Sequence, residues 1–298
     1  MCIRDRVYTD RNIEEILRCS DHITFNSVAQ FERFGPMALL RGISCGLRIN
    51  PQYSPVETDL YNPCVPGSRL GVTADLLKEL PAGIDGLHFH VLCESRPHHL
   101  RLALEAVEKH FGQYLDRIKW LNMGGGHLMT HAEYDCDELI ALLREFKARH
   151  PHLRLILEPG SAFTWRTGYL VSTIEDLVEN AGVHTVMLDV SFACHMPDCL
   201  EMPYKPAIVG AHEPAEGEKR WRMGGTSCLA GDYYGDWTFD HELKVGERIV
   251  FEDMIHYTMV KTTMFNGVAH PAIVIARRDG RIDVVREFGY EDFRNRMS

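Results

Sequence analysis

A run of three glycines marks a place in this sequence where a ligand could be held. Gly124, Gly125 and Gly126 follow a short apolar run in the stretch LNMGGGH, residues 121–127. Successive backbone N–H groups in a turn ahead of a helix form a cradle for an anion, so the glycines suit a phosphate. A tight turn between a strand and a helix, which also favours glycine, is the alternative.

Other side chains capable of chemistry lie near the ends of further apolar runs. His88 and His90 are two apart in LHFHV and therefore share one face of a strand. Arg48 lies in LRIN and Glu158 in ILEPGSAF. In a barrel of parallel strands these groups converge on the C-terminal rim, where such enzymes carry their catalytic residues. Arg48 also suits an ion pair inside the barrel, and His88 a packed interior position.

The spacing of apolar residues predicts parallel strand–helix units in the first half of the chain. Asp135 is the expected N-cap of the last helix, with Glu138 three residues on. A (β/α)8 TIM-like barrel needs eight units and six are counted, so we expect two N-terminal units to be missing and the chain to be truncated. The predicted strands are 7–8, 22–26, 44–50, 86–91, 118–123 and 153–158, and the predicted helices are 11–18, 27–34, 97–111 and 135–149.

After residue 168 the sequence pattern changes to short runs rich in strand-forming residues, which are separated by Gly, Pro and Asp. The runs include GYLVSTI, HTVMLDV, KPAIVGA, ERIVFEDM, AIVIARR and RIDVVREF. This pattern is typical of an antiparallel β-sandwich or barrel. The predicted organisation is therefore an incomplete β/α barrel over residues 1–167 and a C-terminal β domain over residues 168–298.

Composition narrows the class of protein. The 298 residues are 45% apolar, and 32 basic against 42 acidic residues give a net charge of −10. Without a basic stripe, nucleic acid is not an expected partner, and the negative surface field mildly favours a cationic ligand. No apolar run reaches the ~20 residues that span a membrane, and no signal peptide is visible, so a cytoplasmic location is expected. The nine cysteines form no C-x-x-C pair, and reduced thiols are expected.

Five motifs, taken together, resemble a known family. FHV, NMGGG, EPG, GGTSCLAGD and FEDMIHYT occur in the order and approximate spacing of the pyridoxal-phosphate decarboxylases of alanine-racemase fold, also called fold type III. This group contains ornithine and diaminopimelate decarboxylases, and the resemblance covers nearly everything from residue 7 to the end. Leu92 and Cys93 replace the glycine-serine pair of relatives that act on amino acids. HVLCES and LDVSFACHMPDCLEMPYKP resemble the carboxynorspermidine decarboxylases of polyamine biosynthesis, which also act on carboxyspermidine.

The resemblance implies a site for pyridoxal 5′-phosphate. His90 would stack on the pyridine ring, and Glu158 would pair with its nitrogen and keep it protonated, which makes the ring an electron sink. The phosphate would be held by the glycines Gly124–Gly126 and by Tyr257, and Arg48 completes the expected cofactor site.

The resemblance also implies a substrate site shared between the subunits of a homodimer. Cys228 would reach the site from the other subunit and donate a proton to the carbon that loses carbon dioxide. Together with Glu158 and His90, Cys228 forms the predicted catalytic set. Asp232 would meet the distal amine of the substrate, and Ser161, which follows EPG where relatives carry a larger polar residue, is a further predicted substrate contact.

Carboxylates are the expected partners of a cationic polyamine tail, because an ammonium group removed from water needs an opposite charge. Asp189 and Asp198 in LDVSFACHMPD are the first candidates. Glu201 and Asp236 are further ones. Loop carboxylates that simply face solvent remain the alternative for Asp198, Glu201 and Asp236. The sequence does not rank carboxynorspermidine against carboxyspermidine, since one methylene changes binding by only ~1–3 kcal/mol.

Departures from the family pattern leave other functions open. The family's Schiff-base lysine lies on the first barrel strand, and none of the lysines at 78, 109, 119, 147, 205, 219, 244 and 261 stands at a recognisable equivalent. We therefore expect the activity to belong to a complete parent chain, or the chain to be a non-catalytic, decarboxylase-like regulator of an active partner. A barrel metal-dependent hydrolase built on the His88-x-His90 pair is a third reading. It lacks convincing further ligands, since His127 and His131 lie beyond the glycine turn and His98 and His99 on a helix, so no metal is predicted.

Overall fold

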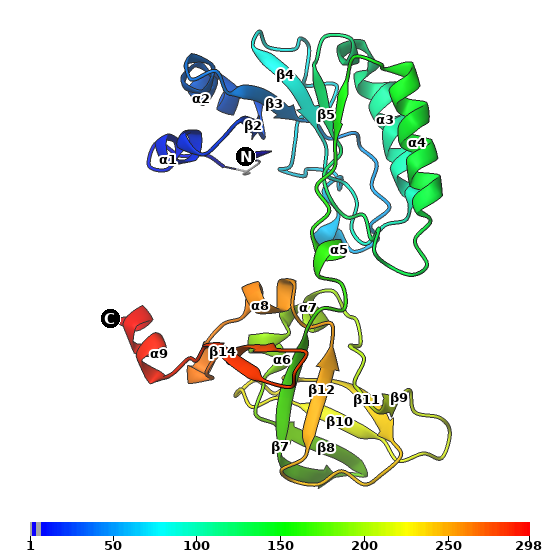
Figure 1. Ribbon diagram of the computed structural model, residues 1–298, viewed down its shortest axis with the longest axis vertical. Helices are drawn as coiled ribbons and strands as arrows, with labels where there is room; N and C mark the ends of the chain where they lie inside the picture. The colour runs from blue at the N-terminus through cyan, green and yellow to red at the C-terminus, as the bar shows by residue number, and fades with distance from the viewer. Residues whose placement is uncertain (1, 4–6) are drawn as a thin grey trace. The chain divides into compact units, whose positions relative to one another are not determined.

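The computed structural model describes residues 2–3 and 7–298 and consists of two compact units, Met1–Phe163 and Thr164–Ser298 (Figure 1). The first unit is built on a six-stranded parallel sheet in which strands consecutive in sequence are neighbours in space. This winding is that of a β/α barrel wall. Its strands are β1 (Cys2–Ile3), β2 (His22–Phe25), β3 (Ser44–Arg48), β4 (Ile84–His88), β5 (Trp120–Asn122) and β6 (Arg154–Ile156).

The prediction of a strand at residues 7–8 is wrong. These residues lie in a loop, and the first described strand is β1. Tyr8 is nevertheless buried, with its ring edge-on to Phe25 at 5.6 Å and its hydroxyl donating to the Thr24 carbonyl at 2.9 Å. Packing of the Tyr8 side chain against strand β2, rather than pairing of its backbone, therefore explains the apolar character of this stretch.

Four helices connect the strands of the first unit: α1 (Ile13–Arg18), α2 (Val28–Leu40), α3 (Pro97–Leu115) and α4 (Cys136–Arg149). Figure 1 shows α3 and α4 side by side. The predicted cap of α4 is confirmed, because the Asp135 carboxylate accepts from the Glu138 N–H at 2.8 Å. Helix α2 runs six residues beyond its predicted end, through Pro36, because Phe34 and Ala38 continue its buried face. A short turn, η1 (Asp59–Tyr61), and α5 (Ser161–Thr164) complete this part of the chain.

Packing in the core of the first unit explains why two neighbouring strands each carry a glycine at the same level. Trp120 of β5 is buried, and its indole lies where a Cβ at Gly46 of β3 or Gly86 of β4 would be. The indole N–H donates to the Ser44 hydroxyl at 2.9 Å. The two glycines therefore make room for one large side chain, and a side chain at either position would push it out of the sheet.

The second unit contains a curled six-stranded sheet with the order β12-β7-β8-β10-β11-β9. All described neighbours are antiparallel except β8 and β10, which run parallel. The strands are β7 (Tyr169–Asn180), β8 (Val183–Leu188), β9 (Ala211–His212), β10 (Trp221–Gly224), β11 (Tyr233–Phe239) and β12 (Arg248–Glu252), and a separate hairpin is formed by β13 (Ile273–Ala276) and β14 (Ile282–Arg286).

Strand prediction in this unit was incomplete. Of the run KPAIVGA, residues 205–211, only Ala211 enters a strand, and β10 and β11 were not predicted at all. Strand β10 is central in the sheet although it carries Arg222, because that side chain pairs with Asp236 on β11 at 3.1 Å. A cross-strand ion pair can thus place a charged residue in a strand that an apolar pattern does not reveal.

Three short helices of the second unit contact one another, and two of them carry the predicted site residues Asp198, Glu201 and Tyr257. They are α6 (Phe192–His195), α7 (Pro197–Glu201) and α8 (Tyr257–Lys261), followed by η2 (Phe265–Gly267) and, at the end, α9 (Tyr290–Met297). The Thr263 N–H donates to the Cys194 carbonyl at 2.8 Å, which fastens the segment after α8 to α6. Among the described residues, none of these helices or those of the first unit is long and apolar enough to span a membrane.

Candidate active site

Asn122 links the predicted carboxylate to the glycine turn. It is fully buried at the end of β5. Its side-chain N–H donates to Glu158 Oε1 at 2.8 Å, and its side-chain oxygen accepts from the Gly124 N–H at 2.9 Å. The amide therefore sets the position of both groups. Sequence reasoning missed Asn122, although a polar residue that closes a buried strand just before three glycines was a usable signal.

His90 lies against the same turn. The Gly125 N–H donates to His90 Nδ1 at 2.8 Å, so Nδ1 is an acceptor and a neutral ring carries its proton on Nε2. The ring stacks at 11° on that of His88, with 6.4 Å between ring centroids. Buried His88 in turn has its Nε2 4.0 Å from Glu158 Oε2. The two histidines and the glutamate thus form one layer at the rim of the parallel sheet.

Arg48 completes this group. It is buried at the end of β3, and its guanidinium lies 3.5 Å from the His90 carbonyl oxygen. The structure therefore brings together four of the predicted features: the histidine, the glycine turn, the glutamate and the arginine. All of them come from the C-terminal ends of β3, β4, β5 and β6, as expected for a barrel rim.

The three glycines are needed for close packing as well as for conformation. Gly124 and Gly126 have φ of +67° and +94°, and a Cβ at Gly125 would overlap the Glu158 carbonyl oxygen. The N–H groups of Gly124 and Gly125 already donate to Asn122 and His90. A phosphate at this turn would therefore depend on its remaining donors. The glycines therefore form a tight turn between strand and helix, and this does not prevent the turn from also binding an anion.

Few charged side chains lie near the glycine turn. His127, directly after the glycines, is buried, and burial lowers its pKa to about 4. Its ring is therefore neutral at pH 7 and adds no positive charge to the turn. The positive charge at this rim comes from Arg48, and the negative charge from Glu158, whose side chain is 19% exposed.

These residues are suited to bind the pyridine ring of pyridoxal phosphate. Glu158 is a partly exposed carboxylate whose direction is set by Asn122, and it can accept a hydrogen bond from a protonated ring nitrogen. His90 is partly exposed, so one face of its ring can meet a planar ligand. The residues of the first unit would therefore hold the pyridine ring, and the phosphate would accept hydrogen bonds from the remaining N–H donors of the glycine turn.

Asp232 organises the loop that carries Cys228 in the second unit. It is 4% exposed, and its carboxylate accepts from the Ala193 N–H at 3.0 Å and from the Ser227 N–H at 2.9 Å. Gly225 lies so close that a Cβ there would overlap this carboxylate. Cys228 itself is exposed. These contacts make Asp232 a support for the loop, and its contact with a substrate amine stays a prediction.

The other predicted carboxylates of this unit have partners in the protein. Asp189 accepts from the Ser172 hydroxyl at 2.6 Å and from the Thr173 N–H at 2.9 Å. Asp198 and Glu201 of α7 both pair with Lys261 of α8.

Two further predicted site residues lie at the starts of short helices. Tyr257 begins α8 and is 57% exposed, whereas Ser161 begins α5 near the end of the first unit.

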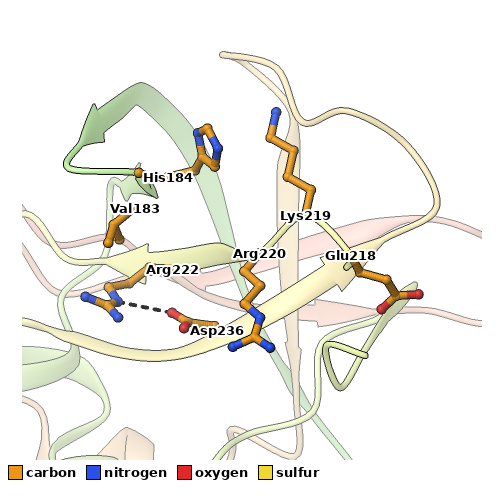
Figure 2. A pocket seen from close by; sticks show the side chains of 8 residues that line it. Val183, His184, Glu218, Lys219, Arg220, Arg222 and Asp236 are labelled. Carbon is orange, nitrogen blue, oxygen red and sulfur yellow. Dashed lines mark hydrogen bonds and ion pairs between the residues drawn. The ribbon is translucent and has the colours of Figure 1, made fainter. Parts of the chain in front are cut away.

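Asp236 lines a pocket of about 370 Å³ in the second sheet (Figure 2). Its carboxylate is paired with Arg222, the ion pair drawn in the figure. Basic side chains dominate the charged lining, which makes the pocket unfavourable for the cationic tail that was predicted to meet Asp236. The lining residues are Gly182, Val183, His184, Glu218, Lys219, Arg220, Arg222 and Asp236.

The metal-site reading gains no support from the side-chain arrangement. Within residues 2–3 and 7–298, no three His, Cys, Asp or Glu side chains come together as they would to hold a metal ion. His88 and His90 stack on one another rather than converging on a common point.

Comparison with known proteins identifies the family. A family profile described as pyridoxal-dependent decarboxylase, C-terminal sheet domain, matches residues 7–255. The chain belongs to this family. It is therefore a pyridoxal-phosphate-dependent carboxy-lyase, and the resemblance, the cofactor and the type of reaction that the sequence predicted are confirmed.

Two curated relatives cover nearly all of this decarboxylase. It is 57% identical over 97% of its length to the carboxyaminopropylagmatine decarboxylase of Synechocystis, and spans 75% of that protein. It is 39% identical over 96% of its length to the carboxynorspermidine/carboxyspermidine decarboxylase of Campylobacter jejuni, and spans 77% of that protein.

Solved structures agree on the fold. The carboxynorspermidine decarboxylase of Campylobacter jejuni in complex with norspermidine superposes with a TM-score of 0.88 at 36% identity, covering 99% of this chain and 80% of that one. The diaminopimelate decarboxylase of Helicobacter pylori with L-lysine has a TM-score of 0.79 at 18% identity, covering 99% and 78%. The predicted class, a β/α barrel followed by a β domain in the alanine-racemase fold, is confirmed.

Proposed function

We propose that this decarboxylase removes carbon dioxide from a carboxylated polyamine, a linear polycation with an amino-acid group at one end. Relatives named for such substrates share 57% and 39% of its residues over nearly the whole chain. In the structure, the cofactor-dependent part of this proposal is supported by the Glu158 carboxylate, held by Asn122 beside the glycine turn and His90. This arrangement provides the acid partner that the cofactor's ring nitrogen requires.

When bound, pyridoxal phosphate supplies an electron sink for the electron pair released as carbon dioxide leaves. Glu158 would keep the ring nitrogen protonated, and Asn122 would hold the carboxylate in place for this task. His90 would cover one face of the ring. Arg48, whose guanidinium lies near the His90 carbonyl, adds positive charge at the rim, and Tyr257 is the proposed phosphate contact from the second unit.

Cys228 is the proposed proton donor to the carbon that has lost carbon dioxide. Its thiol is exposed on a loop that Asp232 fixes through two backbone N–H groups. An exposed thiol on a well-anchored loop can reach a substrate held by another surface. We therefore propose a homodimer in which the Cys228 loop of one subunit completes the site of its partner, with Asp189, Asp198, Asp232 and Ser161 as the candidate substrate contacts.

The substrates named for the two relatives differ at the far end of the tail. The agmatine-derived tail ends in a guanidinium group, whereas norspermidine-type tails end in an ammonium group. The higher identity to the first relative favours the guanidinium-ended substrate. A guanidinium is planar and binds carboxylates through paired N–H groups, which an ammonium cannot do.

Product formation by the protein expressed from its complete gene and loaded with pyridoxal phosphate tests this proposal. The substrates are carboxyaminopropylagmatine, carboxynorspermidine, carboxyspermidine, ornithine and diaminopimelate, and each product is quantified by mass spectrometry. We expect the largest kcat/KM for one of the three carboxylated polyamines. A larger kcat/KM for ornithine or diaminopimelate would refute the proposed substrate class.

A further inference from the structure

His88 lies in a row of side chains that crosses the parallel sheet of the first unit. Arg48, His88 and Asn122 are the last residues of β3, β4 and β5. They occupy matching register positions, since Arg48 pairs with His88 and His88 pairs with Asn122. Residues in matching register on neighbouring strands project to the same face of a sheet. The register therefore places His88 directly beside Asn122, the residue that holds Glu158.

His88 faces the second carboxylate oxygen of Glu158. Its Nε2 is 4.0 Å from Glu158 Oε2, whereas the Asn122 amide donates to Oε1 at 2.8 Å. Each carboxylate oxygen carries two lone pairs, so these contacts leave acceptor sites for a ligand. The Glu158 side chain is therefore approached from two neighbouring strands, β4 and β5, and can still accept a hydrogen bond from a ring nitrogen.

Packing keeps the His88 ring in this orientation. The side chain is fully buried, and its ring is nearly parallel to that of His90, at 11° with 6.4 Å between centroids. His90 is itself held by the Gly125 N–H, which donates to its Nδ1 at 2.8 Å. Because interiors are close-packed, a fully buried ring does not turn freely. Nε2 of His88 therefore stays directed toward Glu158.

We propose that His88 is a second positioning residue, whose Nε2–H directs the Glu158 carboxylate and stabilises its ionised form. The inference rests on the proposed function, in which Glu158 is the acid partner of the cofactor's ring nitrogen. In that pair, one proton is shared between the carboxylate and the nitrogen. A hydrogen-bond donor beside the carboxylate favours the form in which the acid is ionised and the nitrogen carries the proton.

A role in packing alone is the alternative for His88, and two amide side chains distinguish it from the proposed role. The amide nitrogen of glutamine lies where histidine has Nε2, whereas that of asparagine lies where histidine has Nδ1. His88→Gln therefore keeps a donor directed toward Glu158, and His88→Asn does not. His88→Leu fills the space without any donor.

Nitrogen-15 NMR tests the inference without turnover, in the protein expressed from its complete gene and loaded with pyridoxal phosphate labelled at the ring nitrogen. The resonance lies between the values of the free cofactor in acid and in base, and its position gives the ratio of protonated to unprotonated nitrogen. At neutral pH we expect this ratio to fall about fivefold in His88→Leu and His88→Asn, the effect of losing one contact to a charged group. In His88→Gln the ratio should stay within about twofold of the wild type.

The matched control removes a histidine that contacts a glutamate elsewhere in the same unit. His150 Nε2 lies 3.0 Å from Glu108 Oε1, at the end of α4 and on α3 rather than at the rim. His150→Leu should leave the ratio unchanged. An unchanged ratio in His88→Leu or His88→Asn, or an equal fall in all three His88 variants, overturns the inference. Circular dichroism checks folding, and the asparagine and glutamine variants give the comparison if the leucine variant does not fold.

The two proposals can fail separately. If the ring nitrogen of the wild type is unprotonated, or if Glu158→Gln leaves the ratio unchanged, the proposed role of Glu158 is wrong, and the inference about His88 is wrong with it. If Glu158→Gln lowers the ratio and the His88 variants do not, the proposed function stands and only the role of His88 is wrong.

Discussion

Asn122 and Glu158 are joined by a 2.8 Å hydrogen bond from the asparagine amide to the glutamate carboxylate, while the other end of the same amide accepts from the Gly124 N–H. One buried side chain therefore couples the acid that would hold the cofactor's ring nitrogen to the turn that would lie near its phosphate. Because one amide contacts both groups, Asn122 is the positioning residue of the rim.

Replacing Asn122 with leucine, which has a similar shape and no polar atoms, tests this coupling. We expect turnover to fall about tenfold and the free energy of unfolding to fall by ~1–3 kcal/mol, because the buried Gly124 N–H loses its acceptor. Steady-state kinetics and urea unfolding measure the two effects. Wild-type turnover in a folded variant would show that Glu158 needs no such support.

The glycine turn should not tolerate a side chain at its centre. Gly125→Ala places a methyl group against the Glu158 carbonyl oxygen, and we expect a loss of ~1–3 kcal/mol in unfolding free energy together with weaker cofactor binding. Gly112→Ala is the matched control, because that helical position in α3 has open space. There the change should stabilise the protein by ~0.5–1 kcal/mol. Equal stability of the two variants would contradict the packing argument.

Variants of Asp232 and Cys228 should distinguish a residue that supports the loop from a residue that takes part in the reaction. Asp232→Ala leaves the Ala193 and Ser227 N–H groups without their acceptor, so we expect both lower stability, by about 1–3 kcal/mol, and lower kcat. Cys228→Ala should keep the stability and the cofactor absorbance and lose most of the turnover. Thermal unfolding, absorbance and kinetics distinguish the two, and unchanged turnover in Cys228→Ala would remove the thiol from the mechanism.

Two buried histidines should make the protein less stable in mild acid. Burial lowers the pKa of His127 in the first unit and of His195 in the second to about 4, against an ordinary value of 6.5. The unfolded chain therefore binds more protons than the folded one between these values, and stability falls as the pH drops from about 6.5 to 4. Each histidine contributes up to ~3 kcal/mol of this loss.

Urea unfolding at a series of pH values measures this loss. His127→Leu should flatten the profile of the first unit, whereas replacing the exposed His98 of the same unit should leave it unchanged. Identical slopes for the wild type and His127→Leu would show that the buried ring does not stay neutral.

Local patterns in the sequence were sufficient for much of the architecture. The parallel strand–helix units, the cap at Asp135 and the change to a β-rich second half follow from the spacing of apolar residues and from turn chemistry, which act between near neighbours. Residues 7–8 and strand β10 were exceptions, since a buried tyrosine in a loop and a cross-strand ion pair on a strand do not follow those patterns.

The sequence by itself determined the family, the cofactor and the rim that carries His90, the glycines and Glu158, because these residues stand in motifs of fixed order. Only the tertiary structure decided which partners those residues and the acids of the second unit have. Asn122 reaches Glu158 across 36 residues, Asp232 reaches Ala193 across 39, and Lys261 reaches Asp198 across 63. Such contacts depend on how distant segments pack together, and a carboxylate in a sequence does not reveal whether a backbone N–H, a lysine or a ligand will satisfy it.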